Sequence, residues 1–303
     1  MIKLGLALGG GGARGFAHLG VLKVLERENI PIYAITGCSM GALIGGLYAY
    51  FGSAKEVDEF IAKVISDPDF IKYGIQAYDK IESGSGHLKF DDYFDYLKVK
   101  LSFLKLFNNQ SVFNEETTEK MFSYLPDKRI EDLPIKFSAI ATDLLSGEEI
   151  NITTGSLRHA IRASAAIPGF FPPVKLKNYL LVDGSASESV PVAKVKEIGA
   201  QRVVAVDVSK CLKDTGPLDN GIEIIYRTED ITSFHLSQER LLDADLIIRP
   251  KVKDLSWANF NAASDIIKEG ELAAGKMLSE INELSSENKL SYSVRKFFRN
   301  FKK

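Results

Sequence analysis

Apolar residues gather along the chain in short runs, separated by longer stretches with helical spacing. The runs have the length and composition of buried strands. They are Leu4 to Leu8, Ile32 to Thr36, Phe137 to Ala141, Leu180 to Val182, Val203 to Val208 and Leu246 to Ile248. Helical spacing follows the first run in the series Phe16, Leu19, Leu22 and Leu25. This alternation predicts an α/β fold in three layers, with helices on both faces of a mainly parallel central sheet.

The region over residues 67–125 interrupts the alternation. Its apolar residues are largely aromatic and follow no clear period; they include Phe70, Tyr73, Tyr78, Phe90, Tyr93, Phe94, Phe103, Leu104, Leu106 and Phe107. An inserted lid or acyl-binding wall has this composition, because each buried methylene of an acyl chain contributes about 0.8 kcal/mol. Ordinary core packing is the alternative. We predict a catalytic domain over residues 1–285, which contains this insertion, and a tail over residues 286–303.

The C-terminal tail combines positive charge with an apolar stripe. The net charge of the chain is -2, but every charged residue from 289 onward is basic: Lys289, Arg295, Lys296, Arg299, Lys302 and Lys303. Between them, Leu290, Val294, Phe297, Phe298 and Phe301 recur at helical spacing. Such a helix is typical of proteins that lie on an anionic membrane surface. A terminal helix packed on the domain is the alternative, and the acidic body of the chain argues against a nucleic-acid partner.

Cysteine content and hydropathy bear on the cellular location. Cys38 and Cys211 are too few for a disulfide framework and fit a reduced interior. The apolar run at the N-terminus is too short for a signal peptide, and no apolar run reaches the roughly eighteen residues of a membrane span. We expect a cytoplasmic protein that is peripheral at the inner membrane surface, and we leave a homo-oligomer open.

Ser39 has the clearest chemical signature in the chain. It is the centre of Gly37-Cys38-Ser39-Met40-Gly41, which lies between an apolar run and the helical stretch from Ala42 to Tyr50. A G-x-S-x-G pattern between a strand and a helix is typical of a nucleophile elbow, in which a sharp turn exposes the serine hydroxyl. The glycines Gly37 and Gly41 allow the turn. We therefore predict that Ser39 is a nucleophile.

A glycine loop from Gly9 to Gly15 follows the first strand and opens the first helix. Free N–H groups at a helix start attract an anion, which in acyl transfer is the tetrahedral oxyanion. The loop also fits the dinucleotide-binding pattern G-x-G-x-x-G, but no acidic residue ends the next strand to bind a ribose. A phosphate-binding P-loop needs a Gly-Lys-Ser or Gly-Lys-Thr, which the loop lacks. A purely structural turn is the remaining alternative.

Histidine, the usual base for a serine nucleophile, has no clear candidate here. His18 lies in the first predicted helix, His87 in a Gly/Ser-rich stretch and His159 in another helical stretch. His235 follows a candidate aspartate in the chain order of α/β-hydrolases, but it lies inside a helical segment instead of a loop. The elbow also comes earlier in the chain than in typical α/β-hydrolases.

Asp183 is the better candidate for the base. It ends a strand-like run and precedes Gly184, which keeps the space beside it open. A partly buried carboxylate in this position can reach a serine and act as a general base with a raised pKa. Asp143 and Asp207 also end strand-like runs, so a turn-capping role is the alternative.

Taken together, the motifs resemble bacterial patatin-like phospholipases. Gly10-Gly11-Gly12-Ala13-Arg14-Gly15 resembles the oxyanion loop of that family, the Ser39 motif its nucleophile elbow, and Asp183-Gly184 its aspartate motif. Arg162-Ala163-Ser164-Ala165-Ala166-Ile167-Pro168 is similar to the Ala-Ser block of the family. The motifs occur in the family's order and span roughly residues 4–185.

The resemblance implies the patatin-like fold and a serine lipid acyl hydrolase that acts on phospholipids, lysophospholipids or other acyl-ester lipids. It implies that Ser39 attacks the ester, that Asp183 is the base, and that no cofactor or metal takes part. The implied oxyanion loop consists of Gly10, Gly11, Gly12, Ala13 and Arg14. The chain departs from the family at two positions. Ser185 stands where the family more often has Gly or Ala, and Cys38 stands where Thr is common.

Two other functions stay open. A carboxylesterase or acyl-thioester hydrolase would act on smaller soluble substrates, and a series of acyl chain lengths would separate it from a lipid hydrolase. A lipid-binding protein could use the same fold without turnover, although the presence of both Ser39 and Asp183 speaks against it.

Overall fold

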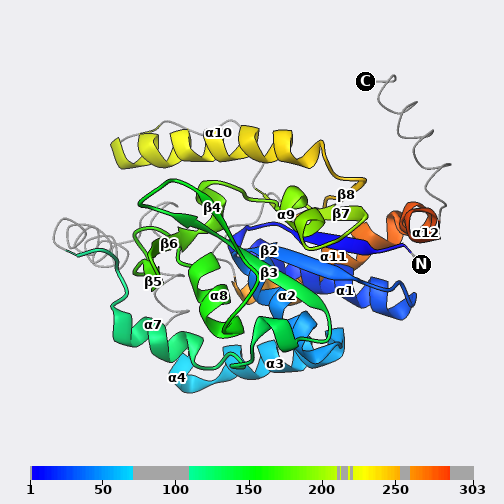
Figure 1. The fold of residues 1–303 in the computed structure, drawn as a ribbon, viewed down its shortest axis with the longest axis horizontal. Coiled ribbons are helices and arrows are strands. Elements are labelled where there is room, and N and C mark those ends of the chain that lie inside the picture. The colour runs from blue at the N-terminus through cyan, green and yellow to red at the C-terminus, as the bar shows by residue number, and fades with distance from the viewer. Residues whose placement is uncertain are drawn as a thin grey trace, which may run out of the picture.

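The computed structural model describes residues 2–70, 109–209, 212, 218, 221–252 and 260–286. Within these residues a single mixed sheet of eight strands forms the centre of the protein (Figure 1). The strands are β1 (Leu4–Leu8), β2 (Ala34–Cys38), β3 (Lys136–Asp143), β4 (Glu149–Ile152), β5 (Val174–Leu176), β6 (Tyr179–Asp183), β7 (Arg202–Val206) and β8 (Leu246–Ile248). Their order is β5-β6-β3-β2-β1-β7-β8, with β4 also paired to β3. Strands β3, β2, β1, β7 and β8 run parallel to one another. At one side of the sheet, the pairs β3–β4, β3–β6 and β5–β6 are antiparallel.

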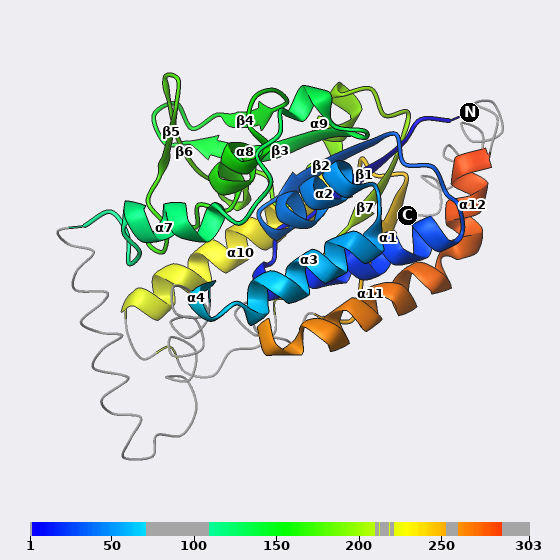
Figure 2. The same cartoon turned by 90° about the horizontal axis from the view of Figure 1, so that it is seen from below.

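Helices cover both faces of the sheet. They are α1 (Ala17–Arg27), α2 (Met40–Phe51), α3 (Ala54–Ser66), α4 (Pro68–Phe70), α7 (Glu115–Phe122), α8 (Leu157–Ser164), α9 (Val192–Glu197), α10 (Gly221–Leu241), α11 (Ala263–Lys276) and α12 (Leu278–Ser286), with short 3₁₀ turns η1 (Gly12–Phe16), η4 (Ile130–Asp132), η5 (Gly184–Ala186) and η6 (Phe260–Ala262). Helices α9 and α10 lie on one face, and α1, α2, α8 and α11 on the other (Figures 1 and 2). This three-layer arrangement confirms the predicted fold class.

The two faces of the sheet differ in the size of their side chains. Leu4, Leu6 and Leu8 of β1 point into the large core beneath α1 and α2. Ala7 points the other way, into a smaller core that α9 covers. Because burial of a leucine side chain contributes about 1.5–3 kcal/mol, the leucine face is the main source of stability.

Helices α1 and α11 cross in direct backbone contact. A Cβ on Gly20 would lie 1.9 Å from the carbonyl oxygen of Ile267, and one on Gly270 would lie 2.0 Å from that of Ala17. Both positions therefore need glycine. The crossing fixes α11 against the helix that follows the glycine loop (Figure 2).

The predicted strands agree with the structure in most places. β1 and β8 have the predicted bounds, β2 begins two residues later than predicted, and β4 and β5 were not predicted. Most of the predicted insertion and the tail from residue 287 lie outside the described residues, so the lid, the membrane helix and the domain boundary stay predictions. Among the described helices, none is both long enough and apolar enough to cross a membrane.

Candidate active site

Ser39 occupies the turn between β2 and α2 at the carboxyl edge of the parallel strands. Its backbone angles, φ 52° and ψ -119°, are rare for a residue with a side chain and cost about 1–3 kcal/mol. The turn is tight, since a Cβ on Gly37 would lie 2.3 Å from the Gly41 carbonyl oxygen and one on Gly41 would lie 2.2 Å from that of Leu8. The sequence motif therefore folds as a strained strand–turn–helix with the serine at its apex.

A buried serine holds this strained turn in place. The Ser39 N–H donates to Ser164 Oγ at 2.9 Å, and Ser164 ends helix α8. Two residues further on, the Ala166 carbonyl accepts the N–H of Asp183 at 2.9 Å. The segment from Ser164 to Ala166 thus connects the backbones of Ser39 and Asp183. In the sequence, this segment was marked only by its resemblance to the Ala-Ser block, which did not predict these hydrogen bonds.

Asp183 lies at the end of β6, buried beside Ser39. Its side chain is almost inaccessible, with the residue 4% exposed. Burial raises the pKa of this carboxyl above its usual value, and hydrogen bonds from Ser39, Ser185 and Cys38 oppose that effect. The structure therefore places the side chain of the predicted nucleophile near enough to the carboxylate of the predicted base to interact with it. A carboxylate with a raised pKa can accept a proton in this geometry.

The other strand-end aspartates have structural roles. Asp143 accepts the Leu180 N–H at 2.8 Å, and Asp207 accepts Arg249 Nε at 3.0 Å. Turn capping does not separate these residues from Asp183, because the Asp183 carboxylate also accepts the N–H of Ser185 at 2.8 Å; Asp183 differs in lying beside Ser39.

Three hydrogen bonds fix the glycine loop. His18 Nε2 donates to the Gly9 carbonyl at 2.7 Å, the Gly10 N–H donates to the Ser189 carbonyl at 2.9 Å, and Arg14 Nε donates to the Gly11 carbonyl at 3.1 Å. Because C=O and N–H of a trans peptide point in opposite directions, the bond from Arg14 turns the Gly12 N–H away from the guanidinium. Gly12 lines the same cavity as Ser39.

The described histidines do not line the cavity at Ser39, although His18 bonds to the glycine loop. Burial lowers the pKa of His18 to about 4, so His18 is neutral at physiological pH. His159 on α8 and His235 on α10 are exposed, and none of these three lines the cavity at Ser39. His87 lies outside the described residues. Among the described residues there is also no group of three or more His, Cys, Asp or Glu side chains that could hold a metal ion.

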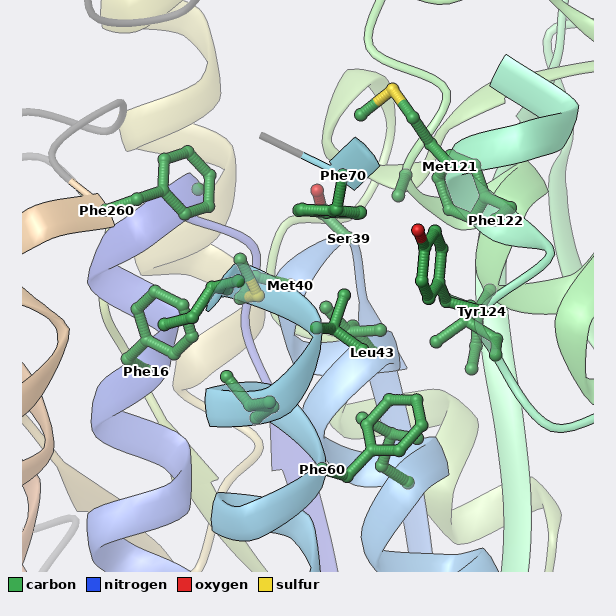
Figure 3. Close-up of a pocket in the computed structure, with 18 of the residues that line it drawn as sticks. Phe16, Ser39, Met40, Leu43, Phe60, Phe70, Met121, Phe122, Tyr124 and Phe260 are labelled. Atoms are coloured by element: carbon green, nitrogen blue, oxygen red, sulfur yellow. The ribbon is translucent and has the colours of Figure 1, made fainter. Parts of the chain in front are cut away.

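An apolar cavity opens from Ser39 (Figure 3). Its volume is about 170 Å³, and its walls come from η1, α2, α3, α7, α8 and η6. Side chains that define it include Phe16, Met40, Leu43, Phe60, Phe122 and Phe260. Of the predicted aromatic wall, Phe70 contributes directly, and its ring meets that of Tyr124 edge-on at 5.6 Å. A long aliphatic group fits such a cavity better than a polar one.

Relatives with known sequences match this chain over part of their length. The chain is 32% identical over 209 residues to an uncharacterized NTE family protein of Mycobacterium tuberculosis, covering 68% of this chain and 49% of that protein. It is 27% identical over 313 residues to lysophospholipase NTE1 of Yarrowia lipolytica, covering 92% of this chain and 20% of that protein. The chain therefore spans about half of the mycobacterial relative and a fifth of the fungal one.

Solved structures with a similar arrangement are more distant. VipD from Legionella pneumophila aligns with a TM-score of 0.49 at 14% identity, over 92% of this chain and 67% of that one. ExoU from Pseudomonas aeruginosa, in complex with SpcU, aligns with a TM-score of 0.37 at 13% identity, over 93% of this chain and 52% of that one.

The family model of patatin-like phospholipases matches residues 6–195. That match contains the glycine loop, the Ser39 turn and Asp183. It covers more than half of the sequence, and the chain belongs to the patatin-like phospholipase family.

Proposed function

We propose that the protein is a serine lipid acyl hydrolase that cleaves fatty acyl esters of phospholipids or lysophospholipids. The observation that carries the proposal is the position of Ser39, which lines an apolar cavity and whose side chain interacts with the buried Asp183 carboxylate. Family membership supports the reaction class, and the name of the relative lysophospholipase NTE1 supports a lipid substrate.

The proposed reaction begins with proton transfer from Ser39 Oγ to the Asp183 carboxylate as Oγ attacks the ester carbonyl. The carbonyl oxygen becomes an oxyanion, which backbone N–H groups of the glycine loop stabilise. The alcohol leaves with the proton that Asp183 returns. Water, deprotonated by Asp183, then releases the fatty acid and restores Ser39.

The bonding of the loop narrows the choice of oxyanion donors. The Gly10 N–H already donates to Ser189, which favours Gly11, Gly12 and Ala13. Of these, Gly12 lines the cavity with Ser39. The role proposed for Arg14 is to orient the Gly11–Gly12 peptide through the Gly11 carbonyl.

The cavity favours a fatty acyl group over a small acyl group. Each methylene that leaves water for an apolar wall contributes about 0.8 kcal/mol, so binding strengthens with chain length until the cavity is full. A carboxylesterase or thioesterase acting on small soluble substrates would gain little from walls formed by Leu43, Phe60 and Phe122.

Hydrolysis of p-nitrophenyl esters of graded acyl length tests the proposal. We expect kcat/KM to rise with chain length in the wild type. Ser39→Ala should abolish activity, Asp183→Asn should lower kcat about 10²–10⁴-fold, and His235→Ala should have wild-type activity. An inactive His235→Ala combined with an active Asp183→Asn would refute the dyad, and an unvarying chain-length series would favour the soluble-ester alternative.

The C-terminal tail supplies the proposed route to the substrate. Its basic residues and its apolar stripe suit an anionic membrane surface, and we propose that it holds the enzyme at the inner face of a membrane. Deletion of residues 289–303 should weaken binding to phosphatidylglycerol-containing vesicles and leave hydrolysis of a short-chain soluble ester intact. Unchanged vesicle binding would exclude this role of the tail.

A further inference from the structure

One oxygen of Asp183 is surrounded by donors from the chain itself. Asp183 Oδ1 accepts the Ser185 N–H at 2.8 Å and the Ser185 hydroxyl at 2.7 Å, and Cys38 Sγ lies 3.7 Å from the same oxygen. A carboxylate oxygen accepts about two hydrogen bonds along its lone pairs. Oδ1 is therefore saturated, and Oδ2 is the oxygen with capacity for a further proton.

The two donor side chains are themselves held in place. Cys38 Sγ lies 3.5 Å from Ser185 Oγ, and the Ser185 hydroxyl packs against the glycine loop, since a Cβ on Gly10 would lie 2.7 Å from it. Burial raises the pKa of the Cys38 thiol well above its usual value, and the nearby Asp183 charge adds to the effect. Cys38 therefore keeps its S–H proton and acts as a weak donor.

We infer that Ser185, assisted by Cys38, is a positioning residue that fixes the orientation of the Asp183 carboxylate and favours its ionised form, so that Oδ2 receives the Ser39 proton. The inference rests on the proposed function. Neither side chain lines the substrate cavity.

The pH dependence of Ser39 labelling by a fluorophosphonate tests this role directly. In that reaction Ser39 Oγ bonds to phosphorus, fluoride leaves, and the serine proton passes to Asp183. The second-order labelling rate falls at low pH as Asp183 becomes protonated, so the acidic limb of the profile reports the pKa of Asp183. No lipid substrate is needed.

Ser185→Ala should move the acidic limb to higher pH by about one unit, because a hydrogen bond to the ionised carboxylate is lost. Cys38→Ala should move it in the same direction by less, since a thiol is the weaker donor. Ser187→Ala is the matched control in the same loop, because the Ser187 hydroxyl bonds to Thr142 Oγ1 at 2.7 Å instead of the carboxylate, and its limb should stay in place.

Two results would overturn the inference but not the proposed function. In the first, the wild type is labelled and Ser185→Ala has its acidic limb at the same pH as the wild type. In the second, Ser187→Ala shifts the acidic limb as far as Ser185→Ala does. A wild type that is not labelled at any pH would overturn the proposed function as well. Thermal unfolding of each variant shows that the compared proteins are folded.

Discussion

The cavity next to Ser39 and the hydrogen-bond network around Asp183 differ in the chemistry of their side chains. The cavity has walls of aliphatic and aromatic side chains such as Leu43, Phe60 and Phe122. Asp183, by contrast, is held by directed hydrogen bonds, from Ser185 to its carboxylate and from its own N–H to the Ala166 carbonyl. Apolar contact is non-directional, whereas a hydrogen bond weakens steeply with misalignment.

This difference separates two kinds of substitution. A change in the cavity should alter which substrates react, because it acts through the apolar area that an acyl chain buries. A change in the network should alter the reaction of all substrates equally, because in the proposed mechanism every ester uses the same nucleophile and base. The following experiments test that separation in order of expected effect.

A charge inside the cavity should have the largest effect on the preference for long acyl chains. Leu43 lies between Ser39 and Phe60 (Figure 3), and Leu43→Asp places a carboxylate along the path of the acyl chain. We expect the ratio of kcat/KM for dodecanoyl and butyryl p-nitrophenyl esters to fall about 1000-fold, the equivalent of roughly five buried methylenes. Leu43→Met is the control and should keep the ratio. Equal losses for both esters would show that the cavity does not hold the acyl chain.

A second buried carboxyl, five residues after Asp183, makes the stability of the protein depend on pH. Glu188 is inaccessible to solvent, and burial together with the neighbouring Glu149 charge raises its pKa to about 8, with Arg240 and Lys194 opposing. The folded protein therefore keeps a proton that the unfolded chain loses above its pKa of 4.5, and stability falls as pH rises from about 4.5 to 8.

Glu188→Gln removes this proton linkage. Relative to the wild type, the variant should gain roughly 3 kcal/mol in the free energy of unfolding between pH 5 and pH 8, as measured by urea denaturation at each pH. Glu197→Gln, on the exposed end of α9, should show no such trend. If the free energy of unfolding of the wild type does not change over this pH range, Glu188 does not lose its proton there in the folded protein.

Loss of the bond that supports the elbow should have a moderate effect. Ser164→Ala leaves the buried N–H of Ser39 without its acceptor, which costs about 1–3 kcal/mol. We expect a lower melting temperature and an equal drop in kcat/KM for short and long esters. Ser237→Ala removes another buried hydroxyl, one that bonds within α10, and should leave kcat/KM unchanged. A drop confined to long esters would contradict the assignment of Ser164 to the nucleophile.

The smallest effect should come from reshaping the cavity wall. Phe60 on α3 lines the cavity and lies beyond Leu43 from Ser39 (Figure 3). Phe60→Ala should shift the preferred acyl length upward and raise kcat/KM for the longest esters a few-fold, about 1 kcal/mol. Phe60→Trp should shift the preference downward. Parallel shifts in both variants would show that Phe60 does not limit chain length.

The strands and the site motifs could be predicted because they are local in sequence. β1 is an uninterrupted apolar run, and the Ser39 motif contains its own turn chemistry. β2 was misplaced because it continues through Gly37 and Cys38, neither typical of strands, and pairing of Cys38 with Ile140 of β3 keeps them in the sheet. β4 and β5 were missed because they are short and partly exposed, and β5 follows two prolines.

The supporting residues could not be predicted because their partners are remote. Ser164 contacts Ser39 across 125 positions of the sequence, and Ser185 meets Cys38 across 147. A serine has no periodicity or motif that reveals such a contact. Sequence therefore predicts the proposed reacting groups, while the residues that contact them are found only in the folded structure.

The crossing of α1 and α11 has a consequence for the order of events during synthesis. β1 pairs with β7, whose residues follow after roughly 200 positions, and α11 comes later still. β1 finds its first neighbour, β2, soon after synthesis, but at about 5–20 residues per second its second neighbour follows only after on the order of 10–40 s. The face of α1 that packs against α11 stays uncovered until α11 is made. One face of the earliest helix is therefore among the last surfaces to be buried, and the nascent chain depends on protection from aggregation until α11 emerges.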